Sequence, residues 1–535
     1  MSGSGENKIN QLNEVIMKRT ATVLITIIVF LNLSVVLGAS CARQIADIND
    51  PDLLAVKSAD SVQITRTIDA SNTFREFPDL TAYWNTSVQK APAPIIGKIA
   101  EESFGKAKIT RCWLNLDEMW DYRTRQFDFN FKIGVDKYKD IAEKYRESWN
   151  WEVEAEVNFY DYMKAFSKHS DAVMLTIRRY ERDVLDGKLP VTKEDWRMVF
   201  KTGLKHYKIL CPNIRYVEVG NEYSLKSFMN ATDEEYYQFY KLAYEAVNEV
   251  NEELGLTGDN RILVGGPVVT GAILKIIDRF LEFYSKDSST GKQLDFIAWH
   301  DYHKSIAETA NREKELKALL AKYHLSENLP LFMTEHDPFH FSEDKLEYHY
   351  LNTAYLPKSL YFGSLTSPEV KIFPWVLYHR KEIQTKFMWF SGPNETKTKE
   401  DEIKMFPLGC SVKFLSMLKG KEIQIDNSID RKDLVLASFE KDRLVVETIN
   451  YGDNRDVTLD VTKLKSVFSG FKNGKLHVVK YLIDSTHSNC LAKPDYKGGI
   501  EKIEDSWIDA GNGKIILKHN GLEKNGLVLW QVINK

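Results

Sequence analysis

The feature that most constrains the fold is an alternation of strand-like and helix-like segments between about residues 76 and 420. Short apolar runs alternate with longer stretches whose apolar residues recur at three- and four-residue spacing, a pattern that indicates βα units around a parallel sheet. Eight strands are expected, at Leu80–Val88, Lys108–Leu116, Ala172–Arg178, Ile214–Val219, Arg261–Gly266, Leu294–Trp299, Leu329–Met333 and Val370–Leu377.

Helices are expected between and after these strands. Eight βα repeats fit a closed (β/α)8 barrel. A doubly wound open sheet is the alternative, but no Gly-x-Gly-x-x-Gly turn follows any of the strands, which weakens it. The expected helices are Ile95–Glu102, Val157–Lys168, Lys193–Ile209, Asp233–Leu254, Ile273–Tyr284, Ala307–Tyr323, Leu346–Leu360 and Leu408–Leu418.

After Gly420 the sequence changes to short strands of alternating polarity separated by turn residues, which indicates an all-β, sandwich-like domain. We therefore predict a lead segment over 42–75, a catalytic barrel over 76–420 and a β-sandwich domain over 421–535. The strands expected in the last domain are Asp433–Phe439, Arg443–Ile449, Asp456–Val461, Leu476–Ile483, Gly513–Lys518 and Gly526–Val532.

The first residues have the pattern of an export signal. Met17-Lys18-Arg19 precedes an apolar run from Val23 to Leu37, and small residues follow it. The run is short for a membrane-spanning helix and contains Asn32. We expect residues 1–41 to direct export to the periplasm, the cell surface or the medium, with Met17 as an alternative start.

The cysteines carry two expectations. Cys41 directly follows Gly-Ala-Ser, which resembles a bacterial lipoprotein cleavage site, so a lipid on Cys41 would attach the protein to the outer surface of a membrane. Ordinary signal-peptidase cleavage is the alternative. The other cysteines lack the close spacing of a zinc site or a redox pair, and we expect them to be buried thiols. These are Cys112, Cys211, Cys410 and Cys490.

The charge balance excludes a nucleic-acid partner. The chain has 72 Lys plus Arg against 76 Asp plus Glu, a formal net charge of −4, and no basic run stands out. The sequence does not indicate an oligomeric state.

Candidate catalytic residues follow from the barrel, because active sites of this fold lie where the strands end at their C-terminal side. The fourth strand runs into Asn221-Glu222 and the seventh into Thr334-Glu335. A retaining glycosidase needs one protonated carboxyl group to donate to the leaving oxygen and one ionised carboxylate to attack, roughly 5 Å apart. Strands four and seven face each other across the mouth, so Glu222 and Glu335 can form this pair.

These motifs carry a resemblance. An Asn-Glu pair ending strand four with a Glu ending strand seven resembles clan A glycoside hydrolases. The His-x-Tyr motif at 300–302 and the closing segment from Pro407 to Leu418 resemble glycoside hydrolase family 39, which contains β-xylosidases and α-L-iduronidases. The likeness covers about residues 75–420. Tyr223 stands where the family usually has Pro, and His336 where it usually has Trp, so the sequence resembles a divergent branch of the family.

The resemblance implies roles for the matched residues. Glu222 is expected to be the general acid and base, and Glu335 the nucleophile. Asn221 is expected to bind the 2-hydroxyl of the sugar, while His300 and Tyr302 orient the nucleophile. No cofactor and no metal are required by this mechanism.

Further residues near the strand ends are candidates for substrate binding. Trp375 is expected either to stack on a sugar or to belong to the core. Arg111 and Asn115 are expected to line the pocket. Lys304, together with loop residues His303, His379 and Arg380, would place positive charge at the mouth, which would suit a uronate, although loop cations are more often simply solvated.

The predicted function is therefore a retaining glycosidase that cleaves a plant or host polysaccharide or oligosaccharide, with a xyloside-like or uronide substrate. A carbohydrate-binding surface protein without catalysis is one alternative, which the presence of both Glu222 and Glu335 argues against. A metal-dependent hydrolase on the same barrel is the other. Its ligands would be His300-Asp301 with His303, and His336-Asp337 with His340, but Trp84-Asn85 stands where strand one of such enzymes usually has His-x-His.

Overall fold

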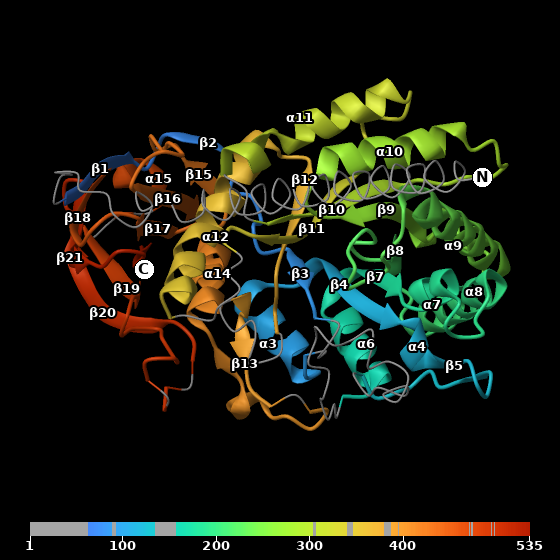
Figure 1. Ribbon diagram of the computed structural model, residues 1–535. Helices are drawn as coiled ribbons and strands as arrows, with labels where there is room; N and C mark the ends of the chain where they lie inside the picture. Colours follow the sequence, from blue (N-terminus) through green and yellow to red (C-terminus); the bar gives the residue numbers. More distant parts are fainter. Residues whose placement is uncertain are drawn as a thin grey trace, which may run out of the picture. The chain divides into compact units, whose positions relative to one another are not determined.

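The computed structural model describes most of the chain after residue 62 (Figure 1). All described residues belong to one compact unit, Val62–Lys535. The export signal and Cys41 lie outside the described residues, as do His303, Lys304, His340, His379 and Arg380. The described ranges are 63–87, 92–133, 157–302, 306–339, 346–378, 387–393, 395–469, 471, 474–493, 495–496 and 498–534.

A parallel sheet of eight strands forms the centre of the first domain, in the order β12-β11-β10-β9-β8-β7-β4-β3. The two ends of this sheet meet, because the backbone N–H of Leu377 donates to the carbonyl oxygen of Asn85 over 2.9 Å. The prediction of a (β/α)8 barrel is confirmed. The strands are β3 (Tyr83–Asn85), β4 (Ala107–Asn115), β7 (Ser170–Arg178), β8 (Ile214–Val219), β9 (Leu263–Val269), β10 (Phe296–Tyr302), β11 (Leu331–Asp337) and β12 (Val370–Pro374).

Helices surround this barrel, and local sequence signals set their ends. Thr192 and Thr232 each begin a helix with a capping box, in which the threonine hydroxyl accepts from the backbone three residues later and an acidic side chain accepts in return. Shorter helices are α4 (Leu116–Met119) and α7 (Glu181–Asp186), and a third, α15 (Leu464–Val467), packs on the core of the β domain. The long helices are α3 (Ile95–Phe104), α6 (Phe159–Lys168), α8 (Lys193–Leu210), α9 (Asp233–Glu253), α10 (Ile273–Lys286), α11 (Ile306–Lys322), α12 (Leu346–Thr366) and α14 (Pro407–Met417).

The barrel interior is apolar in its lower part and polar above it. Side chains of a strand alternate between the two faces, so every second residue points inward. The lower interior is filled by one apolar cluster, and the next inward positions along the same strands carry polar side chains such as Arg111, Thr176 and Glu218. The apolar cluster contains Ile109, Met174, Val268, Phe296, Ala298, Phe332 and Phe373.

The C-terminal domain is a sandwich of two sheets around a second core. The small sheet has the order β1-β18-β21, and the large one the order β2-β15-β16-β17-β22-β19-β20. Its strands are β1 (Gln63–Asp69), β2 (Thr73–Glu76), β15 (Lys421–Ile423), β16 (Asp433–Glu440), β17 (Arg443–Asn450), β18 (Arg455–Thr462), β19 (Lys475–Ile483), β20 (Glu501–Asp509), β21 (Ile515–Leu522) and β22 (Leu527–Ile533).

Two parts of this domain differ from the sequence analysis. Residues 63–76, expected to be part of a lead segment, form β1 and β2, which pair with β18 and β15. Strand β20 was not expected, because most of its side chains are polar and exposed, as befits the edge of a sheet. The β domain therefore contains strands from both sides of the barrel sequence.

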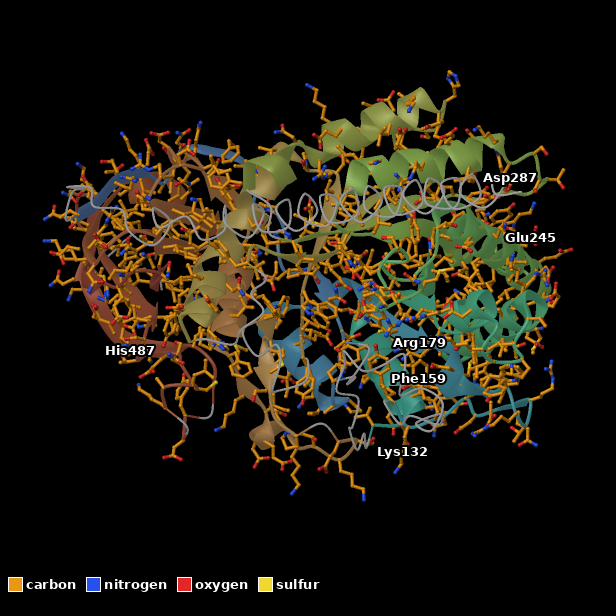
Figure 2. The ribbon with its side chains drawn as sticks, viewed as in Figure 1. Lys132, Phe159, Arg179, Glu245, Asp287 and His487 are labelled. Carbon is orange, nitrogen blue, oxygen red and sulfur yellow. The ribbon has the colours of Figure 1, made fainter. Side chains whose placement is uncertain are left out.

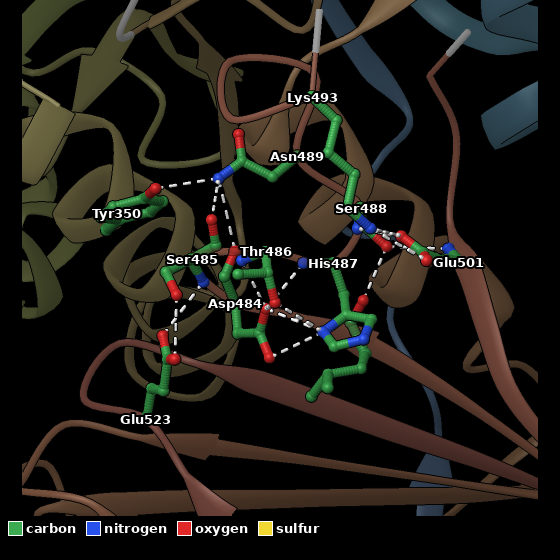
Figure 3. Close-up of polar contacts among 11 residues, drawn as sticks. Tyr350, Asp484, Ser485, Thr486, His487, Ser488, Asn489, Lys493, Glu501 and Glu523 are labelled. Atoms are coloured by element: carbon green, nitrogen blue, oxygen red, sulfur yellow. Dashed lines mark hydrogen bonds and ion pairs between the residues drawn. The ribbon is translucent and has the colours of Figure 1, made fainter. Parts of the chain in front are cut away.

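A loop after β19 connects the β domain to the barrel (Figure 3). Within it, Asp484 accepts from the backbone N–H of His487, and the hydroxyl of Ser485 donates to Glu523. The side-chain amide of Asn489 donates to the hydroxyl of Tyr350 in α12 over 2.8 Å. The following residue, Cys490, packs in a cluster with barrel tryptophans. This loop therefore reaches the mouth of the barrel.

One further expectation, that of buried thiols, can be compared with the described residues. Cys112, Cys211, Cys410 and Cys490 are free and buried, as expected. Among the helices that the structure describes, none combines the length and the apolar character needed to cross a membrane.

Candidate active site

Two carboxylates and an imidazole converge at the mouth of the barrel. Glu222 follows β8, Glu335 lies in β11 and His300 lies in β10, and one side-chain oxygen or nitrogen of each falls within 4.8 Å of the others. The two carboxylates therefore stand at the short separation that retaining glycosidases use, rather than at the longer one that leaves room for a water molecule between substrate and base.

The backbone at the end of β8 turns Glu222 into the mouth. Gly220 has φ of 76°, a left-handed conformation that glycine adopts without a steric penalty. Glu222 itself has φ of 42°, and its N–H donates to the carbonyl oxygen of Val268 on the next strand over 2.8 Å. Neighbouring structure holds this uncommon conformation in place.

Glu222 has the environment of a proton donor. Burial raises its pKa to about 7, while the positive charges of Arg111 and Arg178 act in the opposite direction. Nδ1 of His300 lies 2.8 Å from Oε1 of Glu222. Burial also lowers the pKa of His300 to about 4, so the imidazole is neutral near neutral pH. Its Nε2 lies 3.5 Å from Nη2 of Arg111, which can only donate, so Nδ1 carries the proton and donates to Glu222.

Glu335 has the environment of an anion. Nη1 of Arg111 donates to its Oε1 over 2.6 Å, and the hydroxyl of Tyr302 donates to its Oε2 over 2.5 Å. Charge-assisted hydrogen bonds of this kind favour the ionised carboxylate. The two carboxyl groups therefore have unlike surroundings, because burial favours the protonated form of Glu222 whereas two hydrogen-bond donors contact Glu335.

Arg111 connects several groups of the site. It is fully buried, and its Nε donates to Oε2 of Glu218 over 2.6 Å. The same oxygen of Glu218 accepts from the hydroxyl of Thr176. Nη2 of Arg111 donates to Oδ1 of Asn221 over 3.0 Å. Glu218 thus fixes the guanidinium that in turn holds Glu335 and Asn221.

Aromatic side chains form one wall of the site. The guanidinium carbon of Arg111 lies 4.2 Å from the ring centre of Trp113. Trp113 and Trp375 meet edge to face, with ring centres 6.4 Å apart. Both tryptophans are buried and belong to the cluster that contains Cys490 of the β domain. Trp375 is therefore a wall residue that packs on its neighbours.

Arg178 and Asn115 lie at the ends of adjacent strands. They are paired in the register of β4 and β7, and Nε of Arg178 donates to Oδ1 of Asn115 over 3.0 Å. The amide of Asn115 donates to Glu118 over 3.1 Å. Asn115 is thus engaged with other side chains of the rim, as a support for Arg178.

His336 does not join the site. Its Nδ1 lies 2.9 Å from the carbonyl oxygen of Asp301, and its Nε2 lies 2.6 Å from the hydroxyl of Ser359 in α12. Residue 336 follows the inward Glu335 and therefore points to the outer face of the strand. The second histidine group considered as metal ligands is thus not assembled around the mouth by its described members.

Three buried polar residues beside the site were not singled out from sequence. Glu218 and Thr176 lie one inward position below the rim, and Arg178 is the last residue of its strand. Counting in steps of two back from the strand ends would have identified them, because inward positions alternate. The sequence signal that could have indicated them is a polar residue at an inward position of an otherwise apolar strand.

Comparisons with known proteins point to one family. The model for "Glycosyl hydrolases family 39" matches residues 197–489. A curated β-xylosidase from Caldicellulosiruptor saccharolyticus is 33% identical over 144 residues, a match that covers 23% of this chain and 27% of that protein. The matched part is therefore about a quarter of the length of this relative.

Solved structures share the fold at low sequence identity. A family 39 enzyme from Xanthomonas axonopodis pv. citri aligns with a TM-score of 0.61 and 14% identity, over 90% of this chain and 100% of that one. A family 39 β-xylosidase from Caulobacter crescentus aligns with 0.58 and 13%, over 88% and 100%. A bacterial orthologue of human α-L-iduronidase aligns with 0.60 and 12%, over 88% and 84%.

Proposed function

Because this chain belongs to glycosyl hydrolase family 39, we propose that it hydrolyses glycosidic bonds with retention of configuration, with Glu335 as nucleophile and Glu222 as acid and base. The observation that carries the proposal is the convergence of the two carboxyl groups within 4.8 Å, where burial raises the pKa of Glu222 and Arg111 and Tyr302 donate to Glu335. The glycosidase class follows from the family, and the geometry supports the proposed residue roles.

In the first step, an oxygen of Glu335 forms a bond to the anomeric carbon. The bond from that carbon to the glycosidic oxygen breaks, and the proton of Glu222 passes to the departing oxygen. Arg111 and Tyr302 hold the attacking carboxylate in one orientation. Asn221, which Arg111 holds in turn, is placed to bind the 2-hydroxyl of the sugar.

In the second step, Glu222 is a carboxylate and removes a proton from a water molecule. The water oxygen attacks the anomeric carbon, and the bond to Glu335 breaks. The N–H of His300 donates to Oε1 of Glu222 in both steps, and it stabilises the anion formed between them.

The glycone that we propose is a xyloside-like sugar of a plant or host polysaccharide or oligosaccharide. The matched β-xylosidase supports this choice over the part of the chain that it covers. A uronide is the second candidate, because one structural neighbour is described as an α-L-iduronidase orthologue.

The test is a panel of aryl xylosides, arabinosides, glucosides, galactosides and uronides. We expect one class to be hydrolysed, with the xylosides first. The Glu335→Ala variant should lose at least about 10⁴-fold in rate, the loss typical for a missing nucleophile. Proton NMR of the first-formed sugar should show the anomeric configuration of the substrate.

The competing functions give different results in the same panel. If wild type and Glu335→Ala hydrolyse every glycoside equally, the assignment of the nucleophile is wrong. Loss of activity after dialysis against a chelator would favour a metal-dependent hydrolase. Sugar binding without hydrolysis of any glycoside would favour a binding protein.

A further inference from the structure

Arg178 is a buried cation with most of its hydrogen-bond donors unused. The residue is 4% exposed at the end of β7. Its Nε donates to Asn115, but Nη2 is buried without a hydrogen-bond partner, and neither Nη atom bonds to any part of the chain that the structure describes. No carboxylate of the described residues lies within ion-pair distance of it, although Asp117, Glu181 and Glu118 are near enough to act on its charge.

A buried guanidinium in this state is costly unless something else pairs with it. A buried charge is normally compensated by an opposite charge and by hydrogen bonds to all of its donors. Arg178 has one side-chain acceptor for five N–H groups. A ligand that carries acceptor oxygens would supply the missing partners.

Two aromatic rings fix the direction of the free donors. The guanidinium carbon lies 5.0 Å from the ring centre of Trp113 and 5.2 Å from that of Phe228. With the rings on its faces and Asn115 at Nε, the edge that carries Nη1 and Nη2 is left for a ligand. This edge presents parallel N–H groups that match the two oxygens of a carboxylate.

Arg178 lies nearer the rim of the barrel than Arg111 does. It lies one inward position beyond Thr176 along β7, toward the mouth; its neighbour Arg179 is labelled in Figure 2. Arg111, which contacts the proposed nucleophile, lies deeper in the barrel. Its charge acts on Glu222, the proposed donor to the leaving oxygen. Its direct contacts are with Asn115, Trp113 and Phe228, and none is with Glu335.

We propose that Arg178 binds the carboxylate of an acidic sugar on the leaving-group side, so that the enzyme prefers bonds in which a uronate residue is released. This inference rests on the proposed glycosidase function. It concerns the released sugar, and so it is independent of which sugar is attached to Glu335.

The experiment compares two disaccharides. Both carry the glycone that is hydrolysed best in the aryl glycoside panel, and the released sugar is glucuronic acid in one and glucose in the other. The two differ only at C6, as carboxylate or hydroxymethyl. We expect wild type to show a kcat/KM ratio of about 10 to 100 in favour of the uronate, the effect of a charge-assisted hydrogen bond.

The variants then test the residue. Arg178→Gln should bring the ratio close to one, and Arg178→Lys should give an intermediate ratio because it keeps the charge but not the planar edge. Arg215→Gln is the matched control, since Arg215 lies on β8 and its side chain contacts Gly258, Arg261 and Asp259 rather than the catalytic pair. It should keep the wild-type ratio.

Inhibition of the wild type gives a measurement that needs no variant. D-glucuronate should inhibit hydrolysis of the aryl glycoside about tenfold more strongly than D-glucose. A wild-type ratio near one, or an Arg178→Gln variant that slows both disaccharides but keeps the ratio, would overturn the proposal. Failure of the glycosidase function itself is distinguishable, because then no aryl glycoside would be hydrolysed at all.

Discussion

The Nε of Arg111 donates to Oε2 of Glu218 over 2.6 Å, and neither side chain is exposed to solvent. Through its other nitrogens, the same guanidinium holds Glu335 and Asn221. Glu218 makes no hydrogen bond to Glu222 or His300. It acts on the proposed nucleophile, Glu335, through Arg111.

Glu218→Ala is therefore expected to weaken both folding and catalysis. Removing one partner of a buried ion pair leaves an uncompensated charge, which typically costs about 3–5 kcal/mol. Urea denaturation should show this loss, and kcat should fall while KM for the best aryl glycoside changes less. Glu253→Ala, which removes an exposed carboxylate paired with Lys201 and Lys205, is the control and should change the urea midpoint little. Equal behaviour of the two variants would contradict the role of Glu218.

Tyr302→Phe removes only the hydroxyl that donates to Oε2 of Glu335. A hydrogen bond to a charged group contributes about 1.5–3 kcal/mol, so we expect kcat to fall about 10- to 100-fold. Tyr244→Phe is the matched control, because its hydroxyl donates to Asp287 on the outside of the barrel. Steady-state kinetics of both variants decide the point, and a Tyr302→Phe enzyme as fast as the control would remove Tyr302 from the site.

The pH dependence of the rate should report Glu222. Its pKa is raised to about 7, so the proton donor is lost as the pH rises through 7, and kcat/KM should fall on that side. With dinitrophenyl glycosides, whose leaving group needs no proton, Glu222→Gln should retain bond cleavage in the first step and lack this limb. A wild-type profile that is flat between pH 6 and 8 would contradict the assignment.

Much of the fold could be predicted from the sequence, because the barrel strands are apolar and bounded by turn residues. The expected range Ile214–Val219 is the range of β8. Strands β10 and β11 extend past the expected Trp299 and Met333, since their last residues are polar and look like loop. Strand β3 (Tyr83–Asn85) is shorter than the expected range Leu80–Val88, because the apolar residues Leu80 and Ala82 precede the paired residues.

The rest depends on contacts between distant segments. Strand β1 pairs with β18, and nothing local to residues 63–69 indicates a partner so far along the chain. The pair Glu222 and Glu335 was visible because both stand at strand ends. Glu218 and Arg178 were assigned to strands but not to the site, because the contacts that bring them beside it come from residues on other strands.

The last prediction concerns stability in acid, through His336. Burial lowers the pKa of this imidazole to about 4, below the value of about 6.5 expected in the unfolded chain. Between these two values the unfolded state binds the proton more tightly, so the contribution of His336 to stability is lost as the pH falls from 6.5 to 4. At pH 5 the loss is about 2 kcal/mol relative to pH 7.

His336→Gln should remove this dependence while keeping groups that can bond to Ser359 and to the carbonyl of Asp301. The free energy of unfolding is measured by urea at pH 7 and pH 5 for both proteins. The change in this free energy from pH 7 to pH 5 is then compared between wild type and variant. The comparison is needed because burial raises the pKa values of Glu181 and Glu447 to about 8, so these groups make both proteins more stable as the pH falls. We expect the variant to lose about 2 kcal/mol less than wild type on acidification. An identical loss in both proteins would mean that His336 is already protonated in the folded state at pH 5, which its buried place between β11 and α12 does not favour.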